Sequence, residues 1–336
     1  MREGKNVDLT TKYLGLKLES PLMPGASPMV DDLDWVKRLE DAGASAIVMH
    51  SLFEEQMARE QMGSLKTMDA HDESFAEAAT MFPSAEDYAL GPDKYLERIR
   101  EIKEAVHLPV IASLNGTTLE GWLHYAGLME QAGADALELN VYHLAHDPYE
   151  PGAALEKRIL ELVREMKSAV KIPVAVKLAP FFSSIPHFAS ELVKAGANGI
   201  ILFNRFYQPD IDVDALEVVP TLHLSESHEL LLRLRWIAML SGRVKCSLGA
   251  SGGVHTGLDA IKAIMAGADG VQLVAALLRN GPQHLRKVRE QMVLWMEEHD
   301  YHSVEQMRGS MSHERCPDPT ALERANYLRI LQSWRA

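Results

Sequence analysis

Three polar side chains lie within or directly after apolar stretches of this sequence, where a polar group needs a partner. Lys177 lies in Ile172-Pro-Val-Ala-Val-Lys-Leu178, Asn140 ends Ala134-Asp-Ala-Leu-Glu-Leu-Asn140, and Asn204 follows Gly199-Ile-Ile-Leu-Phe203. Burying an amide or an ammonium without a hydrogen-bond partner costs free energy. The positions of these residues therefore favour a ligand-binding role for each of them, although an asparagine in a loop can simply close a turn.

A glycine-rich turn, Ser251-Gly252-Gly253, separates a short apolar stretch from a helix expected to start near Thr256. Glycines allow a tight turn and leave backbone N–H groups accessible, and a strand, such a turn and a helix N-terminus together form a phosphate site. The next strand–helix unit ends in the small residues Ala275 and Ala276, where the last two loops of a barrel close around a phosphate. A tight turn without a ligand is the alternative interpretation.

Small and amide side chains end two further apolar stretches, at Ala26-Ser27 and at Asn115. Together with Lys177 and Asn140, they suit a flat, polar, phosphorylated ligand such as flavin mononucleotide (FMN). The lysine would neutralise negative charge on the flavin ring, and the amides would hydrogen-bond its pyrimidine edge. As an alternative, Lys177 could form a Schiff base with a carbonyl substrate.

Tyr142 and His143 follow the apolar stretch that ends at Asn140. Both side chains can exchange protons, and His143 is the better candidate for a general base because an unperturbed imidazole titrates near neutral pH. A solvent-facing histidine with no catalytic role is the alternative. We expect no metal site.

Two alternating patterns indicate the elements that must position these residues. Apolar stretches follow Ala-Gly-Ala at 42, 132, 195 and 266, and others start at a proline or a basic residue, in Ser20-Pro21, Leu108-Pro109, Ile172-Pro173 and Arg243-Val-Lys245. The glycine is the residue expected at a helix C-terminus, and the proline suits the first residue of a strand. Eight alternating units predict an α/β protein with a single (β/α)8 TIM barrel, and a doubly wound open sheet is the competing topology. The predicted helices are 32–42, 93–106, 119–132, 154–168, 184–195, 227–241, 256–266 and 282–299.

We expect one domain over residues 1–336, with the barrel at about 18–299 and a tail at 300–336. The tail is predicted to end in a helix over 319–334 that packs on the barrel. Long loops after strands 2 and 6, at 50–92 and 204–226, are predicted to be lids or binding segments, and dimer contacts are the alternative.

The composition argues against several classes of protein. A formal charge of −13 disfavours nucleic acid and anionic membranes as partners. Two cysteines are too few for a disulfide framework or a four-cysteine iron–sulfur cluster. The sequence has neither a signal-peptide pattern nor a long apolar run, so we expect a cytoplasmic protein that acts on a small molecule.

In their order along the chain, several segments resemble the flavin-dependent dihydroorotate dehydrogenases, particularly the soluble class 1 enzymes. These segments are Ser20-Pro-Leu-Met-Pro-Gly-Ala-Ser27, Glu138-Leu-Asn140, Val176-Lys-Leu-Ala-Pro180, Asn204, Gly249-Ala-Ser-Gly-Gly-Val254, Val271-Gln-Leu-Val-Ala-Ala-Leu277 and Asp300-Tyr-His-Ser-Val-Glu-Gln306. The resemblance implies a homodimer and substrate contacts from Asn140 and Asn204. It also implies FMN contacts from Ala26, Ser27, Asn140, Lys177, Ser251, Gly252, Gly253, Ala275 and Ala276.

The sequence departs from the family pattern around the substrate. The family's proton-abstracting Cys or Ser falls at His143, its flanking Pro-Asn falls at Leu144-Ala145, and a second family lysine falls at Met49. The substrate asparagine of the family is not visible in 50–92. We therefore predict a retained flavin site and a rebuilt substrate site, with His143 or Tyr142 as the base.

The leading hypothesis is an FMN-dependent oxidoreductase of the dihydroorotate dehydrogenase type, a family of pyrimidine biosynthesis. A small substrate, dihydroorotate or a related compound, would transfer hydride to flavin N5, and Lys177 would stabilise the reduced flavin. Electrons would leave to a soluble acceptor or an unidentified redox partner. The alternatives are a Schiff-base lyase or aldolase that uses Lys177, and a flavin-binding protein with little turnover.

Overall fold

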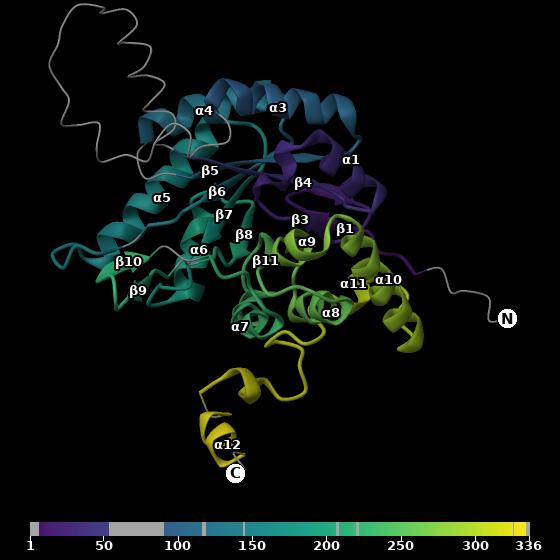
Figure 1. The fold of residues 1–336 in the computed structure, drawn as a ribbon. Coiled ribbons are helices and arrows are strands. Elements are labelled where there is room, and N and C mark those ends of the chain that lie inside the picture. The colour runs from purple at the N-terminus through teal and green to yellow at the C-terminus, as the bar shows by residue number, and fades with distance from the viewer. Residues whose placement is uncertain are drawn as a thin grey trace, which may run out of the picture.

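Eight parallel strands form a nearly closed barrel at the centre of the protein (Figure 1). The computed structural model describes residues 7–53, 91–115, 119–143, 145–205, 208–219, 222–324 and 326–333. The sheet order is β3-β12-β11-β8-β7-β6-β5-β4, and Ser45 N donates to Leu22 O at 3.0 Å where β4 meets β3. The strands are β3 (Leu22–Pro24), β4 (Ile47–Phe53), β5 (Val110–Asn115), β6 (Ala136–Asn140), β7 (Val174–Leu178), β8 (Gly199–Leu202), β11 (Ser247–Ser251) and β12 (Gly270–Leu273). The predicted TIM barrel is confirmed.

Helices surround this sheet at the ranges expected from the sequence (Figure 1). They are α1 (Leu33–Asp41), α3 (Pro92–Ala105), α4 (Leu119–Gln131), α5 (Gly152–Ala169), α6 (Ile185–Lys194), α7 (Leu230–Leu240), α8 (Gly257–Ala266) and α10 (Gln283–Glu298). The glycines of the four Ala-Gly-Ala segments adopt positive φ angles of 91–125° at helix ends, as expected of helix-terminating glycines. None of the helices described here combines the length and apolar character needed to cross a membrane.

An antiparallel hairpin of β1 (Thr11–Tyr13) and β2 (Leu16–Leu18) closes the N-terminal end of the barrel. Tyr13 is fully buried, and a Cβ atom built on Gly249 would lie 2.9 Å from its hydroxyl. A Cβ atom on Gly270 would lie 3.0 Å from the Tyr13 ring. Small residues on β11 and β12 therefore make room for this ring, and the opposite end of the barrel is left for a site.

Asp269 lies just before β12 and is expected to make stability depend on pH. Burial raises the pKa of its carboxyl to about 6, although the Leu248 N–H and Arg308 lower it. The folded protein then binds a proton more readily than the unfolded chain, so this contribution to stability is present at low pH and is lost as the pH rises through 6.

The measurement is urea unfolding of the wild type and Asp269→Asn at pH 5 and pH 7. We expect the stability difference, wild type minus variant, to fall by about 1 kcal/mol between these pH values. A difference that stays constant or grows with pH would contradict this prediction.

The insertion predicted after the sixth barrel strand contains an exposed hairpin, β9 (Asp210–Asp212) and β10 (Glu217–Val219). The other predicted insertion, 50–92, falls mostly on residues 54–90, which lie outside the described part of the chain. Short helices α9 (Ala275–Asn280) and α11 (Val304–Met307) were not predicted.

The prediction of one continuous helix over 319–334 is wrong, although the first part of this segment packs on the barrel through Leu322. A 3-10 turn, Pro319–Leu322, and α12 (Asn326–Gln332) replace it. Asp318 caps the turn, and the chain then extends at Glu323, whose carboxylate contacts His313 at 2.8 Å, so the helix cannot run through. Helix α12 lies apart from the barrel (Figure 1), and Tyr327, Ile330 and Leu331 are 55–63% exposed.

Candidate active site at the C-terminal end of the barrel

Three buried polar side chains form a closed network inside the barrel. Lys177 Nζ on β7 donates to Glu138 Oε1 on β6 at 3.0 Å and to Gln272 Oε1 on β12 at 3.1 Å. Gln272 Nε2 donates to Glu138 Oε2 at 2.6 Å. The three residues are only 1–5% exposed. Because a buried ion pair is stable only when its remaining polar atoms are also bonded, Gln272 completes the pairing of Lys177 with Glu138.

Neutral amides and hydroxyls form a second network beside the lysine. Asn204 Nδ2 donates to Asn140 Oδ1 at 2.7 Å, and Asn140 Nδ2 donates to Ser51 Oγ at 3.3 Å. The Ser51 and Ser113 hydroxyls are 2.8 Å apart. The structure thus brings the two predicted asparagines into direct contact, although Asn204 lies 64 residues beyond Asn140 in the sequence.

Three further predicted residues lie at neighbouring strand ends. Asn115 ends β5 in register with Asn140, and Asn140 is in register with Lys177. Ser27 follows β3 and is buried, and its hydroxyl has no hydrogen-bond partner among the described residues. Ala26 beside it is half-buried. A buried hydroxyl without a partner is rare in folded proteins, which makes Ser27 a candidate for contact with a bound molecule.

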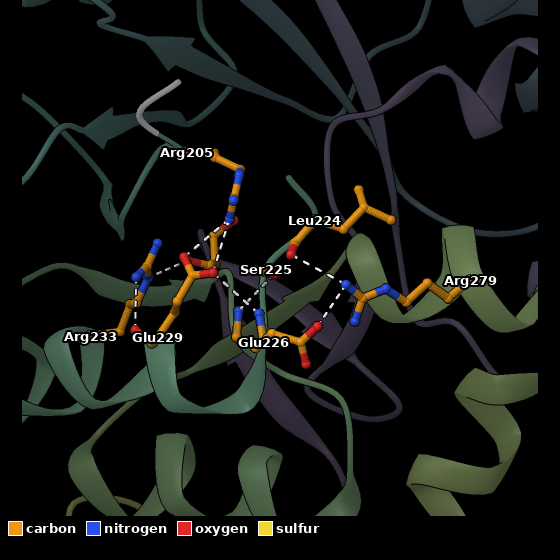
Figure 2. Close-up of polar contacts among 9 residues, drawn as sticks. Arg205, Leu224, Ser225, Glu226, Glu229, Arg233 and Arg279 are labelled. Atoms are coloured by element: carbon orange, nitrogen blue, oxygen red, sulfur yellow. Dashed lines mark hydrogen bonds and ion pairs between the residues drawn. The ribbon is translucent and has the colours of Figure 1, made fainter. Parts of the chain in front are cut away.

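The glycine-rich turn after β11 is held in place by an arginine from α7. Arg233 Nη1 donates to the Glu229 carbonyl at 2.8 Å (Figure 2). Arg233 Nε donates to the Ser251 carbonyl at 3.0 Å. Gly252 and Gly253 have φ angles of +92° and +81°, a region that favours glycine. The predicted residues Ala275 and Ala276 begin α9 and are buried.

Two ion pairs fasten the segment before α7 to the surrounding loops (Figure 2). Arg205 Nη1 lies 3.0 Å from Glu229 Oε2, and Arg279 Nη2 on α9 lies 2.7 Å from Glu226 Oε1. Partial burial raises the pKa of Glu229, but hydrogen bonds from Arg205 and from the Glu226 N–H outweigh it, so the net shift is downward. Both carboxylates thus counterbalance arginines near the glycine turn.

His143 and Tyr142 follow β6, as the sequence indicated. His143 Nε2 lies 3.7 Å from Glu150 Oε2, and Arg158 Nη2 lies 2.7 Å from Glu150 Oε1. Glu150 therefore lies between His143 and Arg158, and Arg158 fixes the carboxylate. The side chains of Tyr142 and His143 are both half-buried, so either of them can reach solvent or a ligand at the rim of the barrel.

Sequence reasoning assigned no role to five residues of this site. They are Ser51, Ser113, Glu138, Arg233 and Gln272. Glu138 and Gln272 could have been found, because each interrupts an apolar strand and so requires a buried partner. The second family lysine falls at Met49, but that side chain is buried in the core between the strands and the helices.

A (β/α)8 barrel with a lysine, amides and a glycine turn at the C-terminal strand ends defines a barrel enzyme. Residues 8–296 match the sequence model of the family named Dihydroorotate dehydrogenase. The chain belongs to the dihydroorotate dehydrogenase family and is an oxidoreductase of that family.

Its curated relatives include catalytic subunits of dihydroorotate dehydrogenase B (NAD(+)). The protein from Thermoplasma acidophilum is 29% identical over 310 residues, which cover 90% of this chain and 98% of that protein. The one from Thermoplasma volcanium is 28% identical over 310 residues, with the same coverage. The one from Methanocaldococcus jannaschii is 25% identical over 317 residues, which cover 91% of this chain and 98% of that protein.

Proposed function

We propose that this protein is an FMN-dependent oxidoreductase that oxidises dihydroorotate or a related small compound. The observation that carries the proposal is the buried ammonium of Lys177, which uses two of its three N–H donors for Glu138 and Gln272 and has no third partner among the residues that the structure describes. FMN, when bound, supplies the acceptor for a hydride.

The residues present fit this cofactor. The partnerless buried hydroxyl of Ser27 can bond to it, and Lys177 can neutralise negative charge on its ring. At the other end of the site, a Cβ atom on Gly253 would lie 2.4 Å from Leu230 N, so only glycine leaves this turn in its present shape. Gly252, Ala275 and Ala276 would hold the phosphate with backbone N–H groups, and Gly253, whose N–H donates to Ser225 Oγ at 3.3 Å, would shape the turn. Ala26, Asn115, Asn140 and Ser251 would complete the binding site.

The chain's own residues would orient the substrate and accept its proton. Asn140 and Asn204, already bonded to each other, offer amide donors and acceptors to a polar ring. His143 would accept the proton, with Glu150 stabilising the imidazolium that results. Tyr142 is the alternative base.

The ion pair of Lys177 with Glu138 argues against the lyase or aldolase alternative. A Schiff base requires an amine that is free to attack a carbonyl carbon, whereas Lys177 Nζ is held by two buried acceptors, Glu138 Oε1 at 3.0 Å and Gln272 Oε1 at 3.1 Å. We retain the flavin-binding protein with little turnover as the second candidate function.

We further propose a homodimer in the cytoplasm that passes electrons to a soluble acceptor or a redox partner. The names of the relatives support a partner, because each of them is called a catalytic subunit of an NAD(+)-linked enzyme.

Absorption spectroscopy of the purified protein, followed by anaerobic addition of dihydroorotate, tests the proposed function. We expect flavin bands, retained or restored with added FMN, and their bleaching by dihydroorotate or a related dihydropyrimidine. Failure to bind added FMN would overturn the proposal. Flavin that no such compound reduces would favour the binding protein with little turnover.

Gly253→Ala is expected to weaken FMN binding at least tenfold. The added methyl group meets the Leu230 backbone at 2.4 Å, and the φ angle of +81° is itself unfavourable for alanine. Gly15→Ala is the matched control, because Gly15 has a φ angle of +82° and nothing lies within 4 Å of its built Cβ atom. Fluorescence titration of both variants with FMN is the measurement, and equal dissociation constants would contradict the prediction.

A further inference from the structure

We propose that Glu138 and Gln272 are positioning residues that set the place and the effective charge of the Lys177 ammonium, and thereby the reduction potential of the flavin. The inference rests on the proposed FMN site, but it concerns residues to which neither the sequence patterns nor the comparisons assign a role. The three side chains come from β6, β7 and β12, and β6 and β12 are not neighbours in the sheet. The network therefore spans the inside of the barrel.

The donor count of Lys177 indicates where its ammonium can act. An ammonium has three N–H donors, and two of them are directed to Glu138 Oε1 at 3.0 Å and to Gln272 Oε1 at 3.1 Å. Within the described part of the chain, the third donor has no partner and is available to a ligand. Because both acceptors are buried and fixed on strands, the ammonium cannot move without breaking these two bonds.

Gln272 has its amide orientation fixed by the same network. Its oxygen accepts from Lys177, and its NH2 group donates to Glu138 Oε2 at 2.6 Å. The reversed amide would direct an N–H group at the ammonium and an oxygen at the carboxylate. Gln272 therefore connects the two charged groups without adding a charge of its own.

The surroundings make the charge of Glu138 effective at a distance. Apolar side chains of the barrel interior lie below the network, among them Met23, Val48, Ile111 and Ile201. Little water is available there to screen charge, so electrostatic interactions are stronger than at the surface. Glu138 neutralises much of the lysine charge that would otherwise stabilise an anionic reduced flavin. We infer that this chain holds its flavin at a lower potential than an unpaired lysine would give.

The experiment is a spectroelectrochemical titration of the FMN-loaded wild type and Glu138→Gln. We expect the equilibrium constant for two-electron reduction of the flavin to be at least tenfold larger in the variant. This corresponds to a midpoint potential that is higher by about 30 mV. Glu138→Asp, which keeps the charge, should retain a potential close to that of the wild type. Gln272→Met should raise the FMN dissociation constant at least tenfold and change the potential less than Glu138→Gln does.

Glu191→Gln is the matched control, because Glu191 also contacts a lysine, Lys194, at 2.6 Å, but on the outer helix α6. Its flavin potential should equal that of the wild type. The inference would be overturned if the equilibrium constant for flavin reduction in Glu138→Gln lay within threefold of the wild-type value. If Glu138→Gln does not fold, equal potentials and equal FMN affinities for Gln272→Met and the wild type would overturn it. A wild type that binds no FMN would instead overturn the proposed function.

Discussion

Replacement of Lys177 by methionine is expected to lower the free energy of unfolding by about 3–5 kcal/mol. Methionine matches the length of the lysine side chain but leaves the Glu138 carboxylate, which is 1% exposed, without its cation. A buried charge that loses its partner destabilises a protein more than the intact pair stabilises it. Urea unfolding of the FMN-free protein at pH 7 measures this effect without a contribution from ligand binding.

The double variant Lys177→Met/Glu138→Gln separates the effect of the charge from the effect of lost packing. We expect it to be more stable than Lys177→Met alone, even though it carries one more substitution. The neutral amide at position 138 can still bond to Gln272 and no longer requires a counter-charge. If both variants unfolded at the same urea concentration, an uncompensated Glu138 charge would not be the cause.

Replacement of His143 by glutamine is expected to slow reduction of the flavin by its substrate 10²–10⁴-fold, about the contribution of a general base. Glutamine keeps a polar side chain of similar size but cannot accept a proton near neutral pH. The FMN dissociation constant should change little, because the imidazole contacts Glu150 and lies outside the network of Lys177. Anaerobic stopped-flow measurement of flavin bleaching gives the rate, with the compound that reduces the wild type as substrate.

His146→Gln is the control for this variant, since His146 is an exposed histidine three residues further along the chain. It should bleach at the wild-type rate. Tyr142→Phe distinguishes the two candidate bases. If Tyr142→Phe slowed bleaching as strongly as expected for His143→Gln, while His143→Gln bleached normally, Tyr142 would be the base.

The barrel could be predicted from the sequence alone, because the evidence for it is local and repeated. A glycine that ends a helix and an apolar run that forms a buried strand each depend on neighbouring residues. The order of these signals then leaves few topologies. The eight predicted helices accordingly begin and end within two residues of the observed ones, when the 3-10 turn Ser227–Glu229 before α7 is included. The hairpin that closes the barrel was missed, because only contact of Tyr13 with Gly249 and Gly270 gives it a role.

The sequence also identified some of the residues that belong to the site. Lys177 and Asn140 could be named because a polar side chain inside an apolar strand must bond to a partner or to a ligand. Their partners were decided by the tertiary structure. Lys177 bonds to Gln272, which lies 95 residues further along the chain, and the curvature of the barrel is what turns β7 and β12, which are not neighbours in the sheet, toward the same interior. Sequence spacing carries no information about such cross-barrel distances, so the charge balance at Lys177 became visible only when the strands were assembled.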